Sequence, residues 1–125
     1  MIRPSSAKYE EWINAYIAAY AEGVEHDPSN WAIQEFINIS FDDPETSWHA
    51  ILDILSRKPN ERVIGALSAG PLEDIVELNG EDFIERIESH ANENPVFRHL
   101  LGGVWESGSK EIWKRVEKAR KNISW

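Results

Sequence analysis

The chain has 125 residues, of which 42% are hydrophobic and 28% charged, which is the composition of an ordinary globular protein with enough apolar side chains for a core. It contains no cysteine, and this excludes disulfides, thiolate nucleophiles and cysteine-ligated metals. Its net charge of −9 repels phosphate backbones, so we expect no nucleic-acid partner.

The charge is spread unevenly along the chain. Residues 1–56 carry two basic and ten acidic side chains, whereas residues 106–125 carry six basic and three acidic ones. We expect the basic segment to pack beside the acidic half or to complement its own helix C-terminus. The first residues, MIRPSSAKYEEW, lack the apolar run of a signal peptide, and no segment approaches a membrane-spanning length. These features predict a cytoplasmic protein with no membrane partner.

Apolar residues in the first half recur at helical spacing between proline and glycine breaks. We expect a first helix that is capped by Ser5 or Ser6 and a third that is capped by Asp43, with Pro44 at its first position. Between them, a turn at His26-Asp27-Pro28 precedes a second helix, for which the expected caps are Asp27, Ser29 or Asn30. The side chains expected to face inward are Tyr9, Trp12, Ile13, Tyr16, Ile17 and Tyr20, then Trp31, Ile33, Phe36, Ile37 and Ile39, and then Trp48, Ile51, Leu52 and Leu55.

The most informative stretch is residues 64–80, which read IGALSAGPLEDIVELNG. A proline just inside a helix start and a glycine just past a helix end are typical of helix boundaries. We therefore expect one helix to end at Gly70 and another to run from Pro71 to Gly80. Glu73 and Asp74 lie in the first turn of the second helix, where its dipole favours negative charge.

The residue pattern in the last third of the chain predicts three more helices. One follows Gly80, a short one begins at Pro95 and ends at Gly102-Gly103, and the last follows Ser107-Gly108-Ser109. Val104-Trp105 reads as an apolar plug between the last two.

These elements predict an all-α fold in a single helical domain, residues 1–125. About seven or eight short helices would form either a compact irregular bundle or a short alpha-solenoid of helical hairpins. Residues 37–41 alternate apolar and polar side chains as a strand would, but we assign them to the second helix. The expected core includes Trp48, Leu52, Leu72, Ile75, Phe83, Ile87, Phe97, Leu101 and Trp113.

No catalytic, cofactor-binding or metal-binding residue is assigned. The chain has no P-loop, no G-x-G-x-x-G and no G-x-S-x-G, and no two histidines have the i, i+4 spacing of a zinc motif. Two charged residues do stand out, because Arg98 and Glu73 each lie within an apolar run. A charge so close to core positions usually needs a partner, so we expect Arg98 to pair with Glu73 or Asp74.

The same two stretches resemble a bacterial family of uncharacterised proteins, a domain of unknown function. The resemblance rests on a G-P-L-E-D segment at residues 70–74 and an F-R-x-L-L-G-G-V-W segment at residues 97–105, joined by a helix with an I-E pattern at Ile87-Glu88. It covers roughly residues 31–121. It implies a small helical bacterial protein and implies no activity.

Two functions from different classes fit these observations. The first is a protein-interaction module whose acidic surface binds a protein partner, a basic one by charge complementarity, in the manner of immunity proteins. The second is an enzyme or small-ligand binder with a pocket near Glu73, Asp74, Arg98 and Trp105. The absence of catalytic motifs favours the first.

Overall fold

The computed structural model describes residues 6–21, 31–121 and 123–125, and the regular structure of these residues is entirely helical. The chain divides into two compact units, residues 1–66 and 67–125, which are described separately below. The single domain expected from the sequence stays a prediction. The expected cap at Ser5, the turn at residues 26–28 and the caps at Asp27, Ser29 and Asn30 lie outside the described residues.

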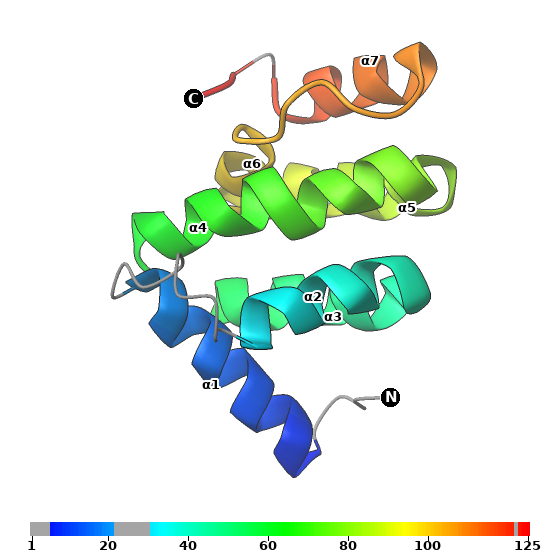
Figure 1. Cartoon of the computed structure of the whole chain (residues 1–125). Coiled ribbons are helices and arrows are strands. Elements are labelled where there is room, and N and C mark those ends of the chain that lie inside the picture. The colour runs from blue at the N-terminus through cyan, green and yellow to red at the C-terminus, as the bar shows by residue number, and fades with distance from the viewer. Residues whose placement is uncertain (1–5, 22–30, 122) are drawn as a thin grey trace. The chain divides into compact units, whose positions relative to one another are not determined.

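The N-terminal unit contains α1 (Ala7–Ala21), α2 (Trp31–Asp42), α3 (Pro44–Ser56) and most of α4 (Glu61–Leu67). The cap expected at Ser6 is confirmed, since its Oγ accepts the Tyr9 backbone N–H at 3.1 Å. Asp43 caps α3 in the same way, with Pro44 at the first position. In Figure 1, α1 crosses the pair formed by α2 and α3.

Aromatic side chains form the centre of the N-terminal unit. The rings of Trp12 and Tyr16 each lie 4.9 Å from the ring of Phe36, in edge-to-face arrangements that aromatic pairs prefer. The Trp12 indole N–H donates to the Ala32 carbonyl at 3.0 Å, so this buried polar group is satisfied. At the edge of this core, the Tyr9 hydroxyl donates to the Asp53 carboxylate at 2.8 Å.

The predicted inward face of α2 is partly wrong. Phe36 is buried as expected, but Trp31 is 46% exposed and Ile37 43% exposed. The phase of the helix is set by Phe36, which contacts both Trp12 and Tyr16, and by the buried Ser40, whose hydroxyl donates to the Phe36 carbonyl at 2.9 Å. Residues 37–41 are helical, as expected.

The C-terminal unit contains a π-helical segment (Ser68–Leu72), α5 (Glu73–Glu93), α6 (Pro95–Leu101) and α7 (Lys110–Ala119). The expected helix break at Gly70 is wrong, since the helical backbone continues through Pro71 into α5. Proline lacks a backbone N–H, and its ring clashes with the carbonyl four residues earlier in an α-helix. The wider π turn accommodates both features, so Pro71 distorts the helix locally without ending it. The expected total of about seven or eight helices counted the segments before and after Gly70 as two separate helices.

The helix end expected near Gly80 corresponds to a kink within α5. Asn79 has φ −138° and ψ 28°, which is not helical, and two helical segments meet there. Figure 1 shows the chain turning back at this point. Of the nine expected core residues, only Leu52 is half-buried, and the other eight are buried.

The basic last helix does meet an acidic side chain, but one on α5. Arg115 of α7 binds both carboxylate oxygens of Glu88, at 2.6 and 2.9 Å. This hydrogen bond is the main reason that the pKa of Glu88 lies below its usual value. The pair is solvent-exposed, so we expect it to contribute little to stability.

Candidate functional site

The two segments that carry the family resemblance are joined directly in the structure. The Ser68 hydroxyl, just before the GPLED segment, donates to the Leu100 carbonyl of α6 at 2.6 Å. Glu73 accepts the backbone N–H of Trp105 at 3.2 Å through its Oε1. The two segments therefore form one structural unit, because each supplies hydrogen-bond partners to the other.

Residues 102–109 connect α6 and α7, and we call them the α6–α7 loop. Side chains of α5 and of Arg120, which follows α7, bind this loop. Glu73 and Glu77 are four residues apart on α5 and so share a helix face. Glu73 accepts the Trp105 N–H, and Glu77 accepts the Gly108 N–H at 2.5 Å. The buried Arg120 donates to the Val104 carbonyl at 2.9 Å from beyond the end of α7. Bonds from charged groups to the backbone are stronger than neutral ones, so this loop is held firmly.

Glycine is required at one position of the α6–α7 loop. Gly108 has φ +74°, a conformation that other residues rarely adopt. A Cβ added there would also lie 2.8 Å from the Val76 carbonyl oxygen of α5. The close approach that lets Glu77 bind the loop backbone thus depends on this residue.

The Trp105 side chain is not buried in the core, contrary to the expectation that Val104 and Trp105 form an apolar plug. Its neighbour Val104 is buried, but the Trp105 side chain is 76% exposed. Because its backbone N–H is bound to Glu73, the loop presents a large aromatic side chain to solvent from a fixed backbone.

Acidic residues follow Trp105 in the sequence or bind its backbone. Glu106 follows it and is exposed, and Glu73 is bound to its backbone. Burial, and then the negative charge of Glu73, raise the pKa of the half-buried Asp74. A cation brought close to Asp74 would favour its ionised form.

Arg98 lies elsewhere, and its expected pairing is wrong. Its Nε donates to the Ala91 carbonyl of α5 at 3.0 Å, and no ion pair joins it to Glu73 or Asp74 in the described part of the chain. The helical phases were correct, but the distance between two helix surfaces depends on tertiary packing, which spacing in the sequence does not give.

Two surface pockets lie in the C-terminal unit. One is lined by residues 76–82 of α5 together with Gly108, Ser109 and Ile112. The other includes Arg98. Neither is lined by Glu73, Asp74 or Trp105, so the four candidate residues do not line either of these pockets together.

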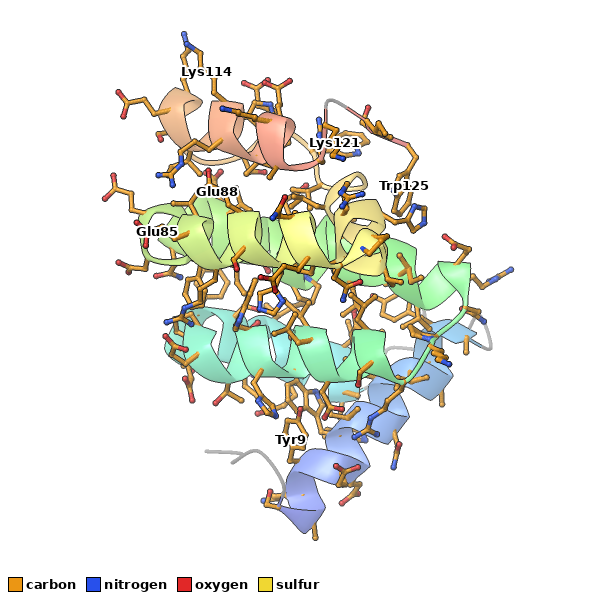
Figure 2. The ribbon with its side chains drawn as sticks, turned by 180° about the vertical axis from the view of Figure 1, so that it is seen from behind. Tyr9, Glu85, Glu88, Lys114, Lys121 and Trp125 are labelled. Carbon is orange, nitrogen blue, oxygen red and sulfur yellow. The ribbon has the colours of Figure 1, made fainter. Side chains whose placement is uncertain are left out.

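Sequence reasoning missed Trp125. Its indole N–H donates to the His99 carbonyl at 2.6 Å, and its ring stacks on the His99 ring at 5.0 Å. It lies beside α6 in Figure 2 and covers Gly102 and Gly103, where an added Cβ would come within 2.6–3.0 Å of the indole. The Gly-Gly pair was the available signal, since adjacent glycines often mark a close approach.

The chain matches a protein family whose function is unknown. A family model described as "Family of unknown function (DUF6869)" matches residues 19–124. No curated protein and no solved structure matches the chain. Within the described residues, no helix is long and apolar enough to cross a membrane, and no three acidic or histidine side chains are grouped to hold a metal ion.

Proposed function

We propose that this chain, which belongs to the family of unknown function DUF6869, is a protein-interaction module that binds a basic protein partner through Trp105. The observation that carries the proposal is the 76% exposure of Trp105 on a loop whose backbone is fixed by Glu73. We place the module in the bacterial cytoplasm, on the basis of the cysteine-free composition and the resemblance to bacterial proteins.

An exposed tryptophan on a fixed loop has the properties of an interface anchor. Tryptophan is enriched among the residues that dominate binding energies, because it buries a large area with few rotatable bonds. A loop that is already ordered loses little conformational entropy on binding. The hydrogen bond from Trp105 to Glu73 supplies this order.

The surrounding charge favours a basic partner. Glu106 belongs to the loop, Glu73 is bound to the loop backbone and Asp74 follows Glu73 on α5, and the chain as a whole carries −9. A lysine or arginine of the partner would meet these carboxylates and would also contact the aromatic face of Trp105. The negative charge disfavours nucleic acid at the same surface.

Replacing Trp105 with alanine is expected to weaken partner binding by roughly 30-fold or more, the usual effect of truncating an anchor residue. Stability should stay within about 0.5 kcal/mol of the wild type, because the side chain is exposed. The test is affinity capture from the native host on immobilised wild type and Trp105→Ala, with mass spectrometry of the retained proteins and denaturant melts of both baits.

Trp31→Ala is the matched control, because Trp31 is also an exposed tryptophan but lies in the other unit. The expected result is a basic protein that wild type and Trp31→Ala retain and Trp105→Ala loses. Moderate salt should elute it, because exposed charge pairs are screened. Equal retention by the wild type and Trp105→Ala would rule out Trp105 as the anchor.

A further inference from the structure

The pocket beside Arg98 contains a concentration of positive charge in an otherwise acidic chain. It has a volume of about 240 Å³ and lies where α5, α6 and the end of α7 meet. Its lining residues are Glu88, Asn92, Arg98, Lys118, Ala119 and Lys121. Three of these six side chains are cationic, whereas the whole chain has 13 basic and 22 acidic residues.

The single carboxylate of the pocket is already engaged. Both oxygens of Glu88 accept hydrogen bonds from Arg115, which does not line the pocket. Glu88 also interacts with Lys118 and so offsets part of the positive charge, but the three cations still outnumber this one carboxylate. The excess of positive charge around the pocket favours the binding of a further anion.

The guanidinium of Arg98 is oriented to bind an anion. Its Nε is bound to the Ala91 carbonyl at 3.0 Å, which fixes the plane of the guanidinium and leaves the two terminal nitrogens as donors. The side chain is half-buried, so its charge is less screened than that of a surface arginine. A planar, fixed guanidinium binds two oxygens of a phosphate or carboxylate together.

Two lysines near the C-terminal end of α7 also line the pocket. Lys118 and Lys121 are three residues apart, and the Lys121 N–H donates to the Lys118 carbonyl at 3.0 Å. Lys121 has φ 56°, in the left-handed region, where the helix has ended. Both lysines line the same pocket.

We propose that this pocket binds a phosphate group, either free inorganic phosphate or the phosphate of a small metabolite. The formal charge of the lining side chains is +2, which a phosphate dianion neutralises. The volume lies below the roughly 300–1,000 Å³ of typical ligand pockets, so the occupant is small. Asn92 adds an amide donor at the same rim. This site is separate from Trp105, and the inference does not depend on the proposed interaction.

The test is a titration of the wild-type chain with inorganic phosphate, followed by amide NMR shifts at constant ionic strength maintained with sodium chloride. Saturable shifts are expected at Arg98, Lys118 and their neighbours. Lys118→Gln and Arg98→Gln should each weaken binding by about tenfold or more, since charge-assisted hydrogen bonds contribute roughly that much. Lys121→Gln provides a third variant if Arg98→Gln does not fold.

Lys114→Gln is the matched control, because Lys114 is on the same helix but extends away from α5 in Figure 2 and does not line the pocket. Its affinity for phosphate should stay within about twofold of the wild type, as expected for a screened surface charge. A parallel titration with glycerol 3-phosphate distinguishes the sources: tighter binding assigns the pocket to a phosphorylated metabolite, and equal or weaker binding assigns it to free phosphate. Non-saturating shifts, or an equal loss in Lys114→Gln and Lys118→Gln, would overturn the proposal.

Discussion

Replacing Phe97 with alanine is expected to lower the free energy of unfolding by about 3–5 kcal/mol. The Phe97 side chain is fully buried in the C-terminal unit, and its ring lies 5.6 Å from the ring of His90 on α5. Truncation removes these contacts and leaves a cavity that the helices around it fill only partly. Urea denaturation with a fixed m-value measures the loss.

Val96→Ala is the control for this substitution, because Val96 is the preceding residue on the same helix and is 50% exposed. It should change stability by less than about 0.5 kcal/mol. If Phe97→Ala costs less than about 1 kcal/mol, the phase of α6 described above is incorrect.

The second large effect is expected for Gly103→Ala. This substitution should lower the free energy of unfolding by about 1–3 kcal/mol, because the added methyl group overpacks the site. An added Cβ would lie 2.8 Å from the Cβ of Ser68 and 2.6 Å from two ring atoms of Trp125. The indole at the end of the chain can shift, but Ser68 belongs to a π-helical segment and its hydroxyl is bound to Leu100. Denaturant melts measure the cost.

Gly65→Ala is the control, and it is expected to raise stability rather than lower it. Nothing lies within 4 Å of a Cβ added at Gly65, which is inside α4. Alanine is the better helix former there, so we expect a gain of about 0.5–1 kcal/mol. A neutral Gly103→Ala would show that the α6–α7 loop and the π-helical segment are less closely packed than the structure indicates.

Local signals in the sequence predicted much of the fold. Caps depend on residues within about one helical turn, so the caps expected at Ser6 and Asp43 are confirmed. The helices expected to begin at Pro95 and after Ser109 do so, and Asn94 and Ser109 cap them. Pro71 misled the prediction because the π turn that accommodates it has no simple sequence signature. The inward face of α2 was misplaced because Trp31 and Ile37 are apolar but exposed, whereas Phe36 on the same helix is buried.

The candidate site was predicted less well, for a physical reason. Glu73 and Trp105 do meet, but through the Trp105 backbone, and side-chain patterns carry no information about backbone partners. Loops have no hydrophobic periodicity, so the outward direction of Trp105 was not predictable from spacing. Arg98 was singled out by its apolar neighbours, yet its partner is a carbonyl of α5 and its surroundings include two lysines from the end of α7.

Hydrogen exchange at the Trp105 amide tests most directly whether Glu73 holds the loop that displays this tryptophan. In the wild type the amide should exchange at least about tenfold more slowly than in an unstructured peptide, since its N–H is bound to a carboxylate. Glu73→Ala should remove that protection, whereas Glu81→Ala, an exposed acid on the same helix, should leave it unchanged. Rapid exchange at Trp105 in the wild type, or full protection in Glu73→Ala, would contradict the role assigned to Glu73.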